Sequence, residues 1–283
     1  MNNANVDKKF WQHFKNVLLI VTISPLFSNC ATTTKSKITT LPDLAPQDLH
    51  RIVSQNFEKL HSFQGKARVI IELPGSGHNG FSEVFINFPD SIFVKTEAML
   101  GIDIGSLFLD SRIFGAYAPR ENVLYYGEVE QLDLREFLQV ELSTNELYEA
   151  LTGLVQITFN DASLVSIDHG QYVLASPLAD GEIRYWIDPN SFLVTKSSLA
   201  NREGKILLSK EMQRIRIRGG VALPQTIRLT RPLARERITV YYTDQKVNRP
   251  IAAAKFRLQH ASNARRVYWG DLDRPQVDRN LSK

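Results

Sequence analysis

Apolar residues recur along the chain with two spacings, one helical and one extended. Between residues 45 and 63 they stand three and four positions apart, as at Leu49, Val53 and Phe57, and this spacing predicts one amphipathic helix. The period then falls to two, and residues 64–73 alternate apolar and polar positions like a strand with one buried face. We therefore expect a helix followed by a sheet.

Further short segments with the same alternation follow, most of them separated by Pro, Gly, Asn or Asp. They cover residues 80–88, 91–98, 104–110, 112–118, 123–129, 171–176, 182–188, 192–200, 205–218, 222–232, 237–244 and 255–259. Asp188, Pro189 and Asn190 predict the turn of one hairpin. Strands this short and closely spaced favour an antiparallel meander over a parallel α/β sheet. The pattern predicts one domain of about eleven strands, in a closed or nearly closed sheet.

A second helical pattern interrupts the strands between residues 132 and 155. Ser143 and Glu146 form a capping-box pair near its middle, and Gly153 is a C-cap residue. The class is therefore mainly β with helices (α+β). We expect the helix at 46–61 and a helical segment within 133–153 to pack against the concave side of the sheet.

The N-terminal region has the order of a bacterial lipoprotein signal. Lys8, Lys9 and Lys15 precede an apolar run from residue 17 to 27 that is too short to span a bilayer, and Cys30 follows. Cys30 is the single cysteine of the chain. The arrangement predicts a signal peptide at residues 1–29 and lipid attachment at Cys30. The alternative is a buried cysteine after an ordinary signal.

Lipid attachment would place the rest of the chain at a membrane. Residues 30–44 are polar and lack aromatics, which is typical of a flexible tether. Within the family of lipoprotein signals, Ala31 after the cysteine indicates sorting to the outer membrane. We therefore expect a monomer that is lipid-anchored to the cell outer membrane and faces the periplasm. With Cys30 modified, neither a disulfide nor thiol chemistry is available.

Charge is divided unevenly along the chain. The formal net charge is +4, but residues 30–195 carry 11 Lys/Arg against 22 Asp/Glu, and residues 196–283 carry 20 against 7. Opposite charges favour docking of the two halves into one body. The basic half could also face anionic lipid head groups or an acidic envelope protein partner. Nucleic acid is a poor partner for an envelope protein.

The sequence contains little that predicts catalysis. The six histidines show neither an HExxH pattern nor paired metal spacing, and there is no GxSxG motif or phosphate-binding glycine loop. We therefore expect a protein that is not an enzyme and has no metal or cofactor.

One basic segment is a candidate surface. Arg214, Arg216 and Arg218 alternate with Ile215 and Ile217, so a strand would present three guanidinium groups on one face and turn the isoleucines to the core. The face is either a solvated one paired with acidic neighbours, or a surface for lipid head groups or an acidic partner.

An apolar loop is the second candidate. Met99, Leu100 and Ile102 stand beside Gly101, where a turn between strands ordinarily carries polar residues. Either the loop folds back into the core, or Met99 and Leu100 form an exposed apolar tip that contacts a membrane or cargo.

The order of these segments resembles the LolA/LolB-like fold of lipoprotein carriers and receptors. The resemblance is carried by residues 45–63, 63–71, 81–101, 185–196, 219–232 and 238–251. The chain resembles still more closely the uncharacterised DUF4292-like predicted lipoproteins, whose Leu-Gly loop matches Leu100-Gly101. The resemblance implies a single curved, unclosed antiparallel barrel over residues 45–260, with a helical lid over an apolar cavity, and residues 261–283 as a polar basic tail. The candidate residues that line this apolar cavity are Val69, Ile71, Phe85, Phe93 and Leu107.

Two functions compete. The first is an outer-membrane-anchored lipoprotein whose cavity binds an acyl chain or a lipidated partner, in lipoprotein or lipid transfer and placement. The alternative is a lipid-anchored accessory or scaffold subunit of an envelope protein assembly, without lipid cargo. An enlarged apolar cavity would favour the first function, and a cavity filled by the protein's own side chains would favour the second.

Overall fold

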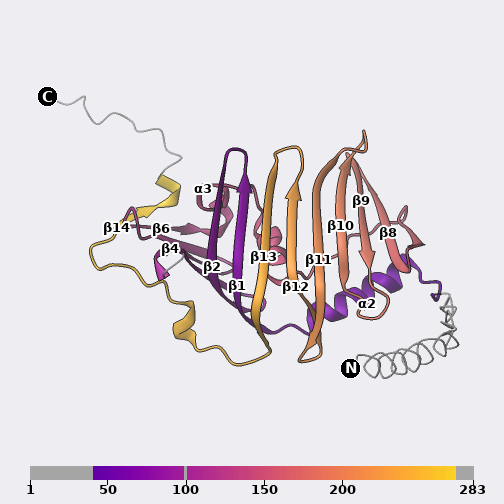
Figure 1. Cartoon of the computed structure of the whole chain (residues 1–283), viewed down its shortest axis with the longest axis horizontal. Helices are drawn as coiled ribbons and strands as arrows, with labels where there is room; N and C mark the ends of the chain where they lie inside the picture. Colours follow the sequence, from indigo (N-terminus) through magenta and orange to yellow (C-terminus); the bar gives the residue numbers. More distant parts are fainter. Residues whose placement is uncertain (1–40, 99–100, 272–283) are drawn as a thin grey trace, which may run out of the picture. The chain divides into compact units, whose positions relative to one another are not determined.

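The computed structural model describes residues 41–98 and 101–271, most of which lie in or against one large sheet (Figure 1). Its strands are β1 (Ser62–Leu73), β2 (Ser76–Asn87), β3 (Ser91–Glu97), β4 (Asp103–Leu109), β5 (Ile113–Ala118), β6 (Val123–Glu128), β7 (Leu164–Asp168), β8 (Gln171–Leu178), β9 (Gly181–Ile187), β10 (Val194–Asn201), β11 (Ile206–Arg218), β12 (Val221–Arg231), β13 (Glu236–Val247) and β14 (Arg265–Tyr268). The helices are α2 (Pro46–Glu58), α3 (Arg135–Leu138) and α4 (Thr144–Thr152), with 3-10 turns η2 (Val129–Gln131), η3 (Ala253–Phe256) and η4 (Trp269–Asp271).

The strands form a 14-stranded sheet in the order β14-β6-β5-β4-β3-β2-β1-β13-β12-β11-β10-β9-β8-β7. Strand β1 lies in the middle because it pairs with β2 on one side and with β13 on the other. Neighbours are antiparallel except β14 and β6, which are parallel. The two end strands, β14 and β7, do not pair with each other. The predicted curved, unclosed antiparallel sheet is confirmed, with fourteen strands rather than about eleven.

Helices α2, α3 and α4 cover one side of the sheet, which we call the inner face; the other side is the outer face. Two clusters of buried apolar residues occupy the inner face. Leu49 and Val53 of α2 pack in the cluster against β8–β11, and Phe57 packs against the larger cluster around β1, β12 and β13. Leu41 and Leu44, at the end of the expected tether, pack on the smaller cluster as well.

Helix α2 is also fixed by a polar contact that its apolar spacing does not reveal. The buried Asn56 side chain donates to the carbonyl oxygen of Ala222 and accepts from the amide of the same residue, each at 3.1 Å. One amide side chain therefore satisfies both backbone groups of a residue at the start of β12.

The helical segment predicted over residues 132–155 is two helices. Gln139 adopts a left-handed conformation (φ 57°) and ends α3, so the prediction of one continuous segment is wrong there. Helix α4 begins with the expected capping box of Ser143 and Glu146 and ends at Gly153. Gly153 has φ 70°, and a Cβ there would lie 2.2 Å from Pro224, so the chain needs glycine on both counts.

The C-terminal part departs from the expectation. Residues 255–259 are not a strand, since η3 and an extended segment cross the outer face instead. Lys255 lies over the ring of Phe85, 5.2 Å from its centroid, and a Cβ at Gly115 would lie 2.4 Å from Leu258. Strand β14 then extends the sheet beyond residue 260, into the segment expected to be a polar tail, and Trp269 is buried in the larger inner cluster. Residues 272–283 lie outside the described part.

Among the described helices, none combines the length and the apolar character that a membrane span requires.

Candidate functional site: the inner face and its opening

The inner face is apolar because each strand turns alternate side chains towards the helices. Val69 and Ile71 of β1 are half-buried and pack against the larger cluster, and Leu107 of β4 is buried within it. Three of the five predicted lining residues therefore do lie on one apolar surface.

The other two predicted lining residues lie on the opposite side of the sheet. Phe85 pairs with Phe93 across β2 and β3, whereas the flanking Val84 and Ile86 belong to the inner cluster. Because successive side chains on a strand point to opposite faces, the two phenylalanines face outward. They remain buried, and Lys255 of the C-terminal segment covers Phe85. The prediction that all five residues line one cavity is therefore wrong for Phe85 and Phe93.

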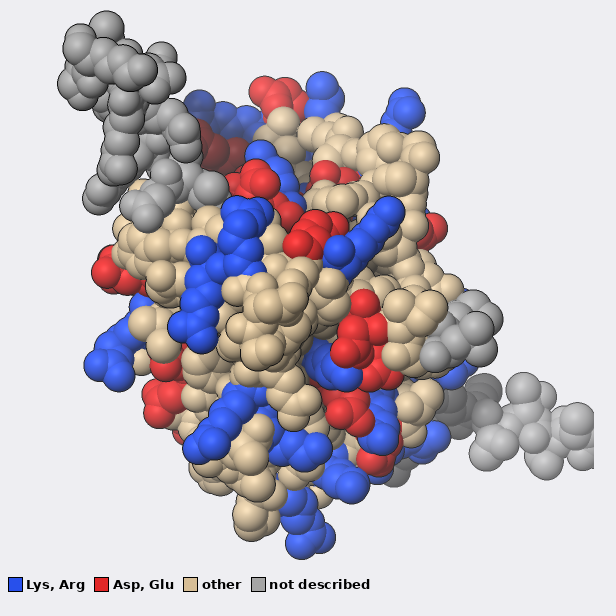
Figure 2. All heavy atoms as spheres, turned by 90° about the vertical axis from the view of Figure 1, so that its left-hand side faces the viewer, with Lys and Arg blue, Asp and Glu red and all other residues tan. Residues whose placement is uncertain are grey.

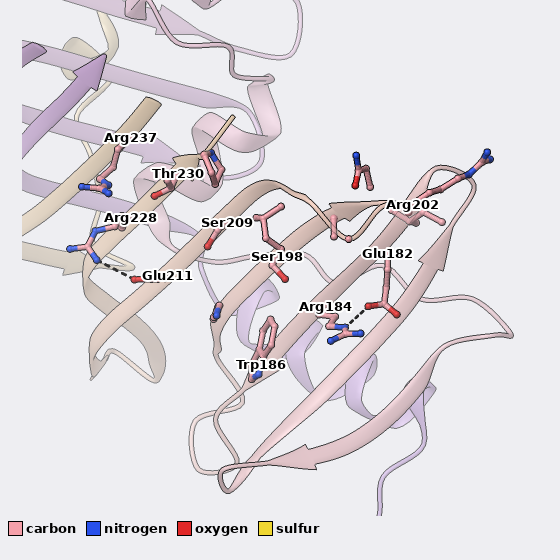
Figure 3. Close-up of a pocket in the computed structure, with 18 of the residues that line it drawn as sticks. Glu182, Arg184, Trp186, Ser198, Arg202, Ser209, Glu211, Arg228, Thr230 and Arg237 are labelled. Atoms are coloured by element: carbon pink, nitrogen blue, oxygen red, sulfur yellow. Dashed lines mark hydrogen bonds and ion pairs between the residues drawn. The ribbon is translucent and has the colours of Figure 1, made fainter. Parts of the chain in front are cut away.

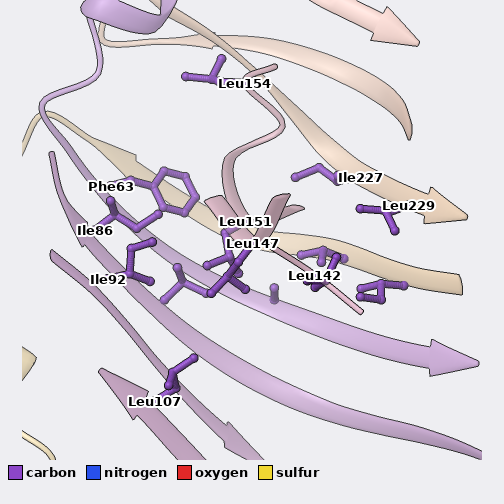
Figure 4. Packing of buried hydrophobic residues seen from close by; sticks show 14 of the residues in the cluster. Phe63, Ile86, Ile92, Leu107, Leu142, Leu147, Leu151, Leu154, Ile227 and Leu229 are labelled. Atoms are coloured by element: carbon purple, nitrogen blue, oxygen red, sulfur yellow. The ribbon is translucent and has the colours of Figure 1, made fainter. Parts of the chain in front are cut away.

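Leucines from the α3–α4 segment (residues 135–152) and from the turn after it occupy the space inside the curved sheet. Leu142, Leu147, Leu151 and Leu154 are all buried. Figure 4 shows them among buried side chains contributed by the strands, namely Phe63, Ile86, Ile92, Leu107, Ile227 and Leu229. The protein's own side chains fill this region of the inner face.

A few polar contacts fasten the α3–α4 segment to the sheet. Arg231 of β12 donates to both carboxylate oxygens of Glu146, at 3.0 and 3.1 Å, and to the carbonyl oxygen of Glu141 at 3.0 Å. The Tyr242 hydroxyl donates to the carbonyl oxygen of Leu151, and burial raises the pKa of this tyrosine. At the other end, the side chains of His78 and Gln139 are joined by a hydrogen bond of 3.0 Å.

One ion pair within this fastening is largely buried. The carboxylate of Glu149 accepts from the ammonium group of Lys210, and each side chain is 13% exposed. Burial raises the pKa of Glu149, and the attraction of Lys210 opposes that rise only in part. The pair therefore ties α4 to β11 at an electrostatic cost.

The inner apolar surface reaches solvent near the turn between β1 and β2. Val69, Ile71 and Leu73 are half-buried there and continuous with the larger cluster. Nearby, the side chain of Ile104 would lie 3.3 Å from a Cβ at Gly80 and is itself exposed. We call Val69, Ile71, Leu73 and Ile104 the inner opening.

The predicted apolar loop is described only in part. Met99 and Leu100 lie outside the described residues, as does Cys30. Of the neighbours, Ile102 is 64% exposed, so this position is not folded into the core.

The basic segment on β11 differs from an ideal strand. Arg214 has a left-handed backbone (φ 58°), which interrupts the alternation. Arg214 and Arg216 are exposed and Arg218 is half-buried, but Ile217 is 71% exposed rather than in the core. No ion pair joins these three arginines to another residue of the described chain. By contrast, Arg228 and Arg237 pair with Glu211 and Glu72.

The charges on the visible surface are mixed. Figure 2 shows Lys and Arg interspersed with Asp and Glu over the side that carries β14 and β6. Within residues 41–98 and 101–271, no group of His, Cys, Asp and Glu side chains is arranged to hold a metal ion.

Several solved structures have a fold similar to that of this chain, at low sequence identity. A DUF1329 family protein from Desulfovibrio piger is 10% identical, with a TM-score of 0.56, and the match covers 75% of this chain and 96% of that one. A LolA superfamily protein from Nitrosomonas europaea is 16% identical, with a TM-score of 0.51, over 76% and 99% of the two chains. A candidate outer membrane lipoprotein-sorting protein domain from Vibrio parahaemolyticus is 12% identical, with a TM-score of 0.53, over 73% and 95%.

No family model matches the sequence, and neither does any curated protein. The likeness to solved structures establishes a LolA-like fold.

Proposed function

We propose that this chain is an envelope lipoprotein that binds an acyl chain, or the lipidated end of a partner, on the inner face and takes part in its transfer or placement. The supporting observation is the apolar cluster that joins Val69, Ile71 and Leu73 of the inner opening to the buried leucines of α4. Within the proposal, Cys30 is the lipid anchor in the outer membrane, binding involves no covalent chemistry or cofactor, and the chain is related to the DUF4292-like lipoproteins.

Binding on this face requires the α3–α4 segment to move, because its leucines already occupy the interior. Burial of an acyl chain stabilises by about 0.8 kcal/mol per CH₂ group, so about ten buried groups supply roughly 8 kcal/mol. That is comparable with the loss of a few buried leucine contacts, at about 2–5 kcal/mol each. The polar fastenings at Arg231, Lys210 and His78 would open in the same step.

The test combines native mass spectrometry with a pair of matched variants. Full-length protein extracted from membranes and exchanged into a volatile buffer should carry a co-purifying lipid. Ile71→Trp should reduce that lipid by blocking the inner opening. Ile70→Trp is the control, because alternation places residue 70 on the outer face of the same strand. Equal lipid loss in both variants would contradict binding at the inner opening.

A second candidate is the accessory or scaffold subunit, and one observation favours it: the interior is filled by Leu147, Leu151 and their neighbours. In a Cys30→Ser background, His78→Cys and Gln139→Cys introduce two thiols that a short bis-methanethiosulfonate reagent can join and a reductant can release. If acyl binding needs the segment to move, the cross-linked protein should lose lipid and recover it on reduction. Absence of bound lipid would favour the scaffold, and bound lipid that is indifferent to the cross-link would contradict the movement of the segment.

A further inference from the structure

A hollow of about 970 Å³ lies on the outer face, across strands β9 to β13, away from the inner opening. Figure 3 shows side chains of the lining on β9, β10, β11, β12 and β13. Tyr185 and Ile187 of β9 pack inward, so the alternating Arg184 and Trp186 point outward into the hollow. We call it the outer groove.

The register of the sheet explains why the groove is hollow. Arg184, Ser198, Ser209, Thr230 and Arg237 stand directly opposite one another on β9, β10, β11, β12 and β13. They form one row across the sheet, with an arginine at each end and three short hydroxyl side chains between. A neighbouring row in the same register carries Trp186, Lys196, Glu211 and Arg228. Long side chains therefore form a wall beside a floor of short ones.

The groove has a surplus of positive charge. Its lining contains two carboxylates, Glu182 and Glu211, which pair with Arg184 and Arg228. Arg202 and Arg237 also line the groove and pair with Asp180 and Glu72, whose carboxylates lie outside the lining. Lys196 forms no ion pair with another described residue, so it supplies the surplus charge. Lys196 lies over the ring of Trp186, 4.7 Å from its centroid, so the indole face is covered on that side. The Nε atom of Arg228 is buried and has no hydrogen-bond partner among the described residues.

The dimensions fit an extended ligand. Neighbouring strands lie about 4.8 Å apart, so the four intervals from β9 to β13 separate Arg184 and Arg237 by roughly 19 Å at the backbone. A ligand lying across the strands along the hydroxyl row would meet a guanidinium group at each end.

We propose that the outer groove binds an acidic saccharide chain, one that carries carboxylate or phosphate groups. Serine and threonine hydroxyls both donate and accept hydrogen bonds, as the hydroxyl groups of a sugar require. Arginine presents a planar fork that matches a carboxylate or phosphate in bidentate fashion. Between its two arginines the row has only serine and threonine side chains, which are under-represented among the anchors of protein partners.

An acidic peptide fits the groove less well. Extended peptides bind sheets by adding a strand at an edge, where backbone groups are free. The backbone of β10–β12 is already paired on both sides, so only side chains are available to a ligand on this face. Saccharide binding in the outer groove is a function in addition to acyl binding, since the two ligands bind to opposite faces of the sheet.

The test is fluorescence anisotropy of labelled hexasaccharides with the full chain in detergent. The probes are a hexagalacturonate for carboxylates, a phosphorylated maltohexaose for phosphates, unmodified maltohexaose and a hexaglutamate peptide. We expect one or both acidic saccharides to bind at least tenfold more tightly than maltohexaose, and added salt to weaken that binding. Their relative affinities identify which anionic group is recognised.

Three variants locate the binding. Ser209→Trp should fill the floor and weaken acidic saccharide binding at least tenfold. Arg184→Ala and Arg237→Ala, both at exposed positions, should each weaken it severalfold while the fold is kept. Ser166→Trp on the exposed strand β7 and Arg216→Ala outside the groove are the matched controls and should change nothing.

The proposal would be overturned if maltohexaose bound as well as the acidic saccharides, if hexaglutamate bound more tightly than either, or if none bound. Binding that survived all three groove variants would also overturn it. Ile71→Trp should leave saccharide binding unchanged, so failure of acyl binding and failure of this proposal can be told apart.

Discussion

The two faces of the sheet differ in what already occupies them. On the inner face, Leu147 and Leu151 of α4 fill the concave space against apolar strand residues. On the outer face, Ser209 and Thr230 form the floor of an unfilled hollow. The apolar inner face, which suits a lipid, is already covered by the protein's own side chains. The outer face is open, and its hydroxyl and charged side chains suit a charged, hydroxylated ligand.

This difference separates two kinds of binding. A ligand of the outer groove has only to displace water and requires no rearrangement of the strands. A ligand of the inner face has to displace protein atoms, so its affinity depends on how firmly the α3–α4 segment is held. Contacts such as the hydrogen bonds from Arg231 to Glu146 should therefore affect the affinity of a ligand for the inner face but not for the outer groove.

The largest effect should come from truncating the packing on the inner face. Leu151→Ala removes a buried side chain of α4 and should lower the free energy of unfolding by about 2–5 kcal/mol. Leu164→Ala, at a position that is 72% exposed on β7, is the control and should stay within about 0.5 kcal/mol. Chemical denaturation measures both. If the two variants were equally stable, α4 would not be packed as described.

A smaller loss of stability is expected when the hydrogen bonds between Arg231 and α4 are removed. Arg231→Ala removes hydrogen bonds to a mostly buried carboxylate and should cost about 1.5–3 kcal/mol. Arg237→Ala breaks the pair with Glu72, at 3.3 Å, between half-exposed side chains, and should cost at most about 1 kcal/mol. Hydrogen exchange of the α4 amides should accelerate in the first variant only. Similar exchange in both would mean that Arg231 does not hold the helix.

The ion pair between Glu149 and Lys210 should make the stability of the folded protein depend on pH. Burial raises the folded-state pKa of Glu149 above its ordinary value of 4.5. The stabilisation from this carboxyl is therefore present below the unfolded-state pKa and declines as the pH rises through the folded-state pKa. Relative to Glu149→Gln, the native chain should become less stable between mildly acidic and neutral pH. Parallel stability curves for the two proteins would contradict this.

The smallest change in stability is expected at Ile102. Ile102→Glu should alter the melting temperature little, because the side chain is 64% exposed. It should nevertheless weaken sedimentation with lipid vesicles if this loop meets the membrane, because burying a charge in lipid is costly. Ile217→Glu, at another exposed isoleucine, is the matched control. Equal vesicle binding of both variants would remove the loop as a contact.

Features that depend on local sequence were predicted well. The capping box of Ser143 and Glu146 and the C-cap at Gly153 follow from the backbone chemistry of a few adjacent residues. Alternation likewise predicted strands, but it could not show that Phe85 and Phe93 face outward. Both faces of β2 and β3 carry buried apolar residues there, because a segment from the C-terminal part of the chain covers the outer one.

The outer groove could not be predicted because it depends on register between strands. Ser198, Ser209 and Thr230 lie in one row only once β10, β11 and β12 are paired. In the sequence they are polar positions on three separate strands. The same holds for Asn56, whose partner Ala222 is 166 residues away.

Hydrogen exchange of the full chain, with and without a bound acyl ligand, tests the central account most directly. If the ligand displaces the α3–α4 segment from the inner face, amides of residues 144–152 should lose protection when it binds. Amides of β10–β12 beneath the outer groove should keep theirs. Unchanged or increased protection across α4 in the lipid-bound protein would contradict the account.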